Sequence, residues 1–494
     1  MFAEKDEKRM SELTDGFVQL CRILVEEIDF FGKGPITPPA QKEVKSAIEA
    51  AAPFLPLVYR EEYVTPLLEN LSSVLATTDA DTVEALTGVV YDHQSGSEVK
   101  VELQRFLAVI SNLYRSFLSD SKRASIDIPL ASVLPPLAVF QHNGEFGPFT
   151  IPSDQISQLF NSEIGIVSLP STYREHPLLW ASLAHETGGH DVTHADAGLL
   201  PELAAGVQAL FGVNPLRVGA SLTDHQIEGL LWSYWIDEAA ADVYGLLNIG
   251  PAFAVNLAAF FAALNEKAGD GTLPSLRTQS GHGLNDMTLD PHPTDILRLH
   301  LAIGVIENLN NLSTRKGEDY IAQLKQLATL CAHKATTIEI QGDIEVERDR
   351  WMRVDISRSL EEMQQSARLV GAYIATAKLQ SLAGHSIQDI ETWDDSDELT
   401  AQQIKDSFQK GTSAADLGDD AQLLAGATIL LAAQPNLYAQ VTRQLNEALD
   451  RSYQRDPIWR TSMRHPVYYR KQHFKEASSP ELAFAVVKNR QHKK

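Results

Sequence analysis

Apolar positions in the N-terminal part of the chain recur at the three- and four-residue spacing of a helix. Phe17, Leu20 and Leu24 form one such row, and the segment from Val101 to Leu113 contains another. This spacing gathers apolar side chains on one face of a helix. The pattern therefore predicts that residues 11–120 are helical.

The pattern changes between residues 126 and 170. Proline, glycine and short β-rich runs (PLAVF, GPFTI and IGIVSL) replace the helical spacing. Runs of this kind, bounded by turn residues, are typical of short strands and hairpins. The strand predicted at Ile164–Leu169 directly precedes the next helical segment.

Helical periodicity returns from Pro177 and continues with interruptions to the C-terminal part of the chain. The predicted helical segments are Pro177–His194, Thr223–Asn248, Pro251–Leu264, Thr294–Leu309, segments beginning near Tyr320 and Trp351, one helix within Ser386–Asp420, and a helix pair in Gln422–Leu449. The Gly-rich segment Asn265–Pro291 has no periodicity and predicts a long loop, a kind that is often functional. We expect this loop to border a cleft and to be mobile without ligand.

These segments predict a mainly α fold with a small β-sheet (α+β). The pattern indicates an N-terminal helical region (1–125), a central region of strands and helices (126–310) and a C-terminal helical region with a basic tail (311–494).

Composition narrows the possible functions. The 494 residues include 42 Lys+Arg and 65 Asp+Glu, a net charge of −23. This acidity argues against nucleic-acid or anionic-membrane partners, and no apolar stretch approaches the ~20 residues of a membrane-spanning helix. The two cysteines cannot form a disulfide framework. With no visible secretory signal, we expect a cytoplasmic protein.

The residues from Arg451 onward carry 11 basic and 3 acidic side chains. We interpret them as a tail that lies on the acidic body of the protein. The alternative is a docking arm for an acidic partner.

The most informative segment is His185-Glu-Thr-Gly-Gly-His190. Zinc hydrolases commonly use H-E-x-x-H on a helix, where both histidines bind the metal and the glutamate takes a proton from the bound water. Here the spacing is one residue longer, which on a regular helix would separate the histidines by about 140°. A π-type turn absorbs one residue, and Gly188 and Gly189 supply backbone freedom. We therefore predict a π-type turn here.

A second segment, Asp237-Glu-Ala-Ala-Ala-Asp242, begins 47 residues after His190. Glu238 and Asp242 are spaced i,i+4 and share a helix face. Glu238 could be the third metal ligand, and Asp242 could accept the free N–H of a ligating histidine.

Together the two motifs resemble those of the dipeptidyl peptidase III family of zincin metallopeptidases, which has H-E-x-x-G-H followed by a helix with E-E-x-x-A-E/D. The resemblance covers about two helices. It implies that residues 126–310 form a zincin-like catalytic core, with Zn²⁺ bound by His185, His190 and Glu238, and Glu186 as the general base. Asp237 stands where that family has a glutamate. The strand at Ile164–Leu169 resembles the edge strand on which zincins lay extended peptides.

Some assignments stay open at this point. Glu186, His190 and His194 share a face of a regular helix and form a competing ligand set. His292, His282 or Tyr244 could donate a hydrogen bond to an oxyanion. The expected function is a zinc-dependent metallopeptidase acting on peptides or proteins. The alternatives are a catalytically inactive metal-binding or regulatory protein and a non-peptidase zinc hydrolase.

Overall fold

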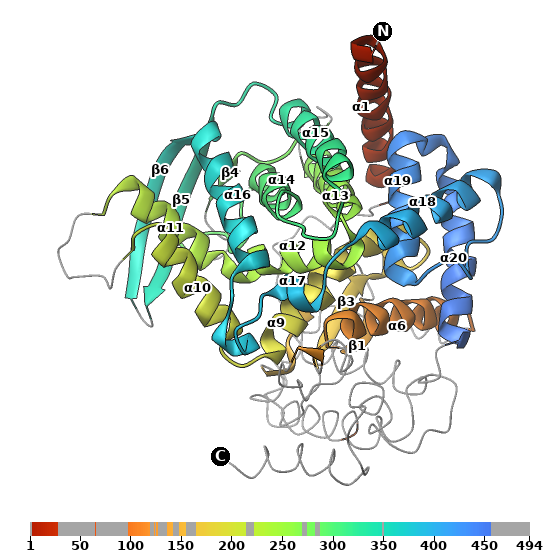
Figure 1. Ribbon diagram of the computed structural model, residues 1–494, viewed down its shortest axis with the longest axis horizontal. Helices are drawn as coiled ribbons and strands as arrows, with labels where there is room; N and C mark the ends of the chain where they lie inside the picture. The colour runs from red at the N-terminus through yellow and green to blue at the C-terminus, as the bar shows by residue number, and fades with distance from the viewer. Residues whose placement is uncertain are drawn as a thin grey trace, which may run out of the picture.

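The computed structural model describes residues 2–27, 65, 97–118, 123, 125–126, 136–141, 148–154, 165–213, 222–268, 274–281, 287–347 and 350–455. Within these residues the fold is mainly α with two small sheets, which confirms the predicted fold class (Figure 1). The α-helices are α1 (Phe2–Glu27), α6 (Ser97–Leu118), α9 (Val192–Ala195), α10 (Leu199–Leu210), α11 (Asp224–Tyr234), α12 (Ile236–Ile249), α13 (Ala252–Ala268), α14 (Asp295–Ile306), α15 (Thr314–Cys331), α16 (Leu360–Thr376), α17 (Ile387–Ile390), α18 (Asp395–Lys410), α19 (Asp420–Ala433) and α20 (Tyr438–Arg455). The shorter helical turns are η3 (Ser171–Tyr173), η4 (Pro177–Ala181), η6 (Gln380–Leu382) and η7 (Pro435–Leu437), and η5 (Ala184–Asp191) is a π-helix.

Helix α12 lies at the centre of the molecule (Figure 1). Every residue of α12 except Asp237 is buried, as expected for a helix that is covered on all sides. It contacts η5, α13, α14 and α16. Gly250, at φ 76°, ends it. The centre of the fold thus carries the segment with the predicted third ligand.

The first sheet has the strand order β1 (Leu137–Gln141), β3 (Ile166–Pro170), β2 (Phe149–Ile151). β3 pairs in parallel with β1 and antiparallel with β2. The central strand is therefore β3, and the prediction that Ile164–Leu169 forms an edge strand is wrong. Strand β2 contacts the π-helix η5. In the described part of the chain, β2 lies at the edge of this sheet.

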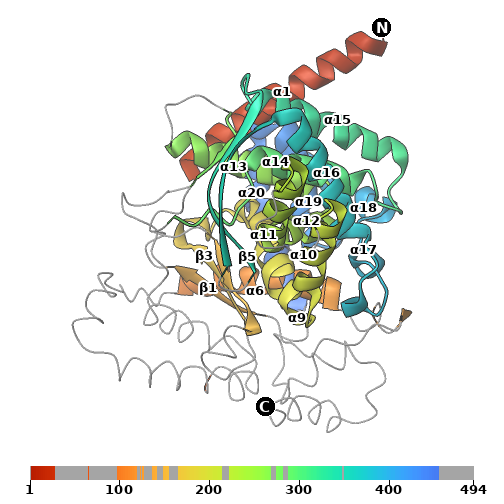
Figure 2. The ribbon, with the colours of Figure 1, turned by 90° about the vertical axis from the view of Figure 1, so that its left-hand side faces the viewer.

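The second sheet contains β4 (Gln279–Ser280), β5 (Thr337–Glu347) and β6 (Arg350–Ser359), in that order. The long β5–β6 hairpin lies beside α11 and α16, on the opposite side of the molecule from α18–α20 (Figures 1 and 2). The predicted helix from Trp351 is wrong, because β6 continues to Ser359 before α16 begins.

Helices from the two ends of the chain join the same core. α1 contacts α13 and α19, and α6 contacts α19 and α20. Apolar side chains of all these helices belong to one buried cluster. No helix in the described part of the chain combines the length and apolar character needed to cross a bilayer.

Candidate metal centre

The segment Ala184–Asp191 forms a π-helix, which confirms the predicted π-type turn. In a π-helix the hydrogen bonds run i→i+5, so His185 and His190 lie on the same side. Their Nε2 atoms are 3.2 Å apart and their ring centroids 4.9 Å apart. The extra residue between the histidines therefore brings the two imidazoles together.

Helix α12 places a carboxylate against both rings. Oε2 of Glu238 lies 3.1 Å from Nε2 of His185, and Oε1 lies 3.4 Å from Nε2 of His190. One ligand atom from each of the three residues lies within 4.8 Å of the others. This His185–His190–Glu238 group could hold a metal ion.

The outer nitrogen of each ring contacts a second carboxylate. Nδ1 of His185 lies 3.0 Å from Oδ1 of Asp242, and Nδ1 of His190 lies 3.1 Å from Oδ1 of Asp237. A carboxylate at Nδ1 favours the tautomer with hydrogen on Nδ1. Both Nε2 lone pairs then face each other beside Glu238, whose buried Oε2 accepts no hydrogen bond from a described residue. Lone pairs placed this close repel one another unless a positive charge, from a metal ion or a proton, lies between them, so the residues fit a metal ion.

The electrostatics of the group also favour a bound cation. Burial lowers the pKa of His190, but Glu238 and Asp237 raise it more strongly, to about 10. Burial opposes ionisation of Glu238, yet the positive charges of His292 and His190 hold the pKa of its carboxyl well below the usual range. The site therefore attracts positive charge, which a metal ion supplies.

Arg298 on α14 binds the carboxylate of Asp242, which contacts His185. The sequence had assigned no role to this arginine. Its Nε and Nη2 donate to the two oxygens of Asp242 at 2.6 and 2.7 Å. Both side chains are almost fully buried, and the guanidinium also lies over the ring of Phe261. The bidentate pair fixes the carboxylate that contacts His185.

His194 lies beside the group but outside it. Its Nε2 is 3.4 Å from Asp237 and its Nδ1 is 3.2 Å from Asp154. The competing set of Glu186, His190 and His194 requires a regular helix, whereas this segment is a π-helix. The geometry thus separates His194 from the clustered nitrogens.

Glu186 is buried next to the group, and its Oε2 accepts a hydrogen bond of 2.9 Å from the Thr150 hydroxyl. His292 also reaches the group. Its Nε2 is 3.3 Å from Oε1 of Glu238, and its Nδ1 is 2.7 Å from Oδ1 of Asp290. The structure therefore brings Glu186 and His292, both selected from the sequence, to the His185–His190–Glu238 group.

Tyr244 does not reach the centre. It is fully buried and packs edge-on against Phe117, and its charged neighbours are Asp196 and Arg123. It follows Asp242 by two residues, a rotation of about 200° on a helix, so it faces away from His185. Its hydroxyl is buried away from the group, which corrects the suggestion that it donates to an oxyanion.

The segment Asn265–Pro291 is a continuous loop in the prediction, but its described parts include the end of α13 and strand β4. Arg277 forms an ion pair of 2.9 Å with Asp290 inside the segment and one of 2.8 Å with Asp295 at the start of α14. His282 and most of the basic tail lie outside the described residues. The expectation that this segment borders a cleft and is mobile stays a prediction.

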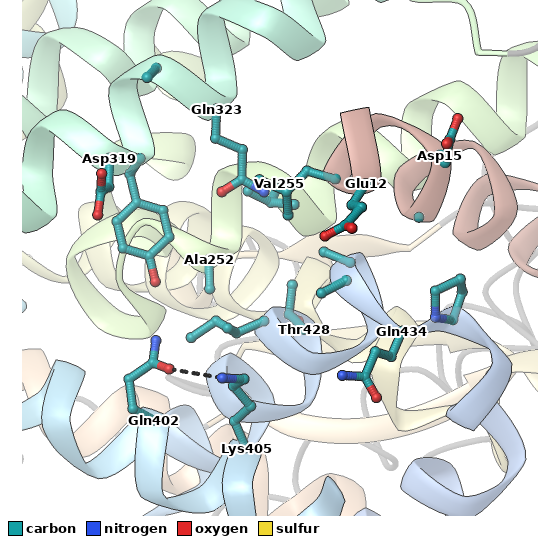
Figure 3. A pocket seen from close by; sticks show the side chains of 18 of the residues that line it. Glu12, Asp15, Ala252, Val255, Asp319, Gln323, Gln402, Lys405, Thr428 and Gln434 are labelled. Carbon is teal, nitrogen blue, oxygen red and sulfur yellow. Dashed lines mark hydrogen bonds between the residues drawn. The ribbon is translucent and has the colours of Figure 1, made fainter. Parts of the chain in front are cut away.

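A cavity of about 1050 Å³ lies apart from the metal centre, between α1, α13, α15, α18 and α19. In Figure 3, Glu12, Gln323, Thr428 and Lys405 surround it. No residue of the His185–His190–Glu238 group lines it.

No protein-family model, curated protein or solved structure matches the chain. Functional inference therefore depends on the metal centre itself.

Proposed function

We propose that the protein is a zinc-dependent metallopeptidase. The observation that carries this proposal is the convergence of His185, His190 and Glu238 within 4.8 Å, with the carboxyl group of Glu186 beside them. Two imidazoles and one carboxylate are a common catalytic zinc set, in which a fourth position stays open for water or substrate. The two free cysteines fit a cytoplasmic enzyme.

Zinc bound here would polarise the scissile carbonyl and make the attacking water more acidic. Glu186 takes a proton from that water and passes it to the leaving amine. His292 donates an N–H to the oxyanion that develops on the carbonyl. Asp242 and Asp237 hold the two histidine rings through Nδ1.

The edge strand β2 supports a peptide as the substrate. β2 ends its sheet in the described part of the chain and contacts the π-helix. An extended peptide can add to such an edge through main-chain hydrogen bonds. A peptide lying along β2 would pass beside Glu186.

A zinc titration of metal-free protein, assayed on a fluorogenic peptide library, tests the proposal. We expect no hydrolysis without metal, full activity near one zinc per chain, and activity reduced about 10²–10⁴-fold in Glu186→Gln despite bound zinc. Metal binding without turnover of any substrate would favour an inactive metal-binding protein. Zinc-dependent hydrolysis of esters alone would favour a non-peptidase hydrolase.

A further inference from the structure

Thr150 makes a pair of contacts with the proposed general base. Its Oγ1 lies 2.9 Å from Oε2 of Glu186 and 2.9 Å from the backbone oxygen of the same residue. Thr150 is the middle residue of β2, where it pairs with Val167 of β3. A side chain of the edge strand therefore reaches the π-helix at the residue that follows the first histidine.

Such a contact helps a glutamate to act as a base, because it limits the positions that the carboxylate can take. Its side chain has three rotatable bonds, and a proton acceptor must lie within hydrogen-bond distance of the water it deprotonates. The Thr150 hydroxyl donates to Oε2, while no described residue forms a hydrogen bond with Oε1 of Glu186. This arrangement restrains the carboxylate and leaves one oxygen available to accept a proton.

We propose that Thr150 is a positioning residue that orients the Glu186 carboxylate toward the attacking water. This inference rests on the proposed function. The hydroxyl has one hydrogen for two acceptors, and the charged carboxylate is the stronger acceptor of the two. Because β2 is also the strand proposed to receive the peptide, one strand aligns both the substrate and the base.

A double-mutant cycle with Thr150→Val and Glu186→Gln tests this role. Valine keeps the shape of threonine and favours strands, so β2 should be retained. We expect Thr150→Val to lower kcat about tenfold to a hundredfold, as for loss of a hydrogen bond to a charged group, with little change in KM. Thr150→Ser should recover most of the activity because it keeps the hydroxyl. In the Glu186→Gln background, Thr150→Val should cause no further loss.

Binding of acetohydroxamic acid to the zinc-loaded variants gives a readout that needs no turnover. This chelator gives up a proton when it binds a metal, so its affinity depends on a well-placed nearby base. Thr150→Val should weaken binding about tenfold when Glu186 is present and have no effect in Glu186→Gln, with zinc content unchanged throughout.

Several outcomes would overturn the inference: full activity of Thr150→Val, an equal loss in both backgrounds, or a Thr150→Ser variant as impaired as Thr150→Val. An inactive wild-type protein would count against the proposed function. The hydroxamate cycle would then still decide whether Thr150 orients Glu186.

Discussion

A Cβ atom on Gly189 would lie 2.1 Å from the Cβ atom of Ala241. The π-helix and α12 therefore meet at this point with no space for a side chain on residue 189. This close approach brings Glu238 on α12 within reach of His185 and His190 on the π-helix. Gly189 therefore allows the two helices to pack closely, in addition to giving the backbone its conformational freedom.

Gly189→Ala should accordingly damage both stability and metal binding. The added methyl group forces the two helices apart, and overpacking of this kind costs about 1–3 kcal/mol or more. We expect a lower free energy of unfolding in urea and a lower zinc content. Gly317→Ala on α15 is the control, because its Cβ would meet nothing closer than 3.7 Å. Equal stability and full zinc in both variants would contradict the packing argument.

Arg298→Met should destabilise the protein and weaken the metal site. It leaves the buried Asp242 carboxylate without its guanidinium partner, a change that typically costs about 3–5 kcal/mol. It also releases the carboxylate that holds His185, which should lower zinc affinity about 10–100-fold. Urea unfolding and competition with a chelator measure the two effects. The control is Arg353→Met, which breaks an exposed pair with Asp343 and should cost less than about 1 kcal/mol.

His292→Phe should retain zinc and lose turnover. Loss of one oxyanion donor typically lowers kcat about 10²–10³-fold. Elemental analysis and steady-state kinetics on the same preparation separate the two roles, with His225→Gln on the exposed start of α11 as the control. Loss of zinc from His292→Phe would identify His292 as a ligand instead of a donor.

His300 should make the protein less stable in acid. Burial and the nearby charge of Arg368 lower the pKa of His300 to about 3, whereas an unfolded histidine titrates near 6.5. Below pH 6.5 the unfolded chain therefore binds a proton that the native chain excludes, so this group lowers stability as the pH falls toward 3.

Between pH 7.5 and pH 5 this residue should account for a loss of about 2 kcal/mol. His300→Gln should reduce the pH dependence of urea unfolding by that amount, whatever its effect at pH 7.5. An unchanged pH dependence in His300→Gln would show that His300 is protonated in the native state.

Local spacing predicts part of the metal centre. The extra residue between His185 and His190 requires a helical irregularity, and the structure has a π-helix there. Local spacing could not give the role of Arg298. A charged residue among the apolar residues of Asp295–Ile306 does indicate that its side chain has a buried partner, but not which one. That partner, Asp242, lies 56 positions away. Thr150 carries no local signal, because its contact depends on how the sheet packs against the π-helix.

The β5–β6 hairpin shows how a periodic signal can be misassigned. Ile338, Ile340 and Ile344 are buried at even spacing on β5, which is the two-residue period of a strand. The helical spacing expected from Trp351 belongs to α16, which begins at Leu360. Pairing with β5 extends β6 up to that point, and such long-range pairing is not visible in a short sequence window.

Zinc content of three purified variants tests the central claim most directly, because it distinguishes the two possible ligand sets. Elemental analysis should find about one zinc per chain in Glu186→Gln and His194→Ala, and loss of zinc in Glu238→Ala, since this last change leaves only two histidine ligands. Zinc retained in Glu238→Ala but lost in Glu186→Gln and His194→Ala would contradict the His185–His190–Glu238 centre and the peptidase mechanism built on it.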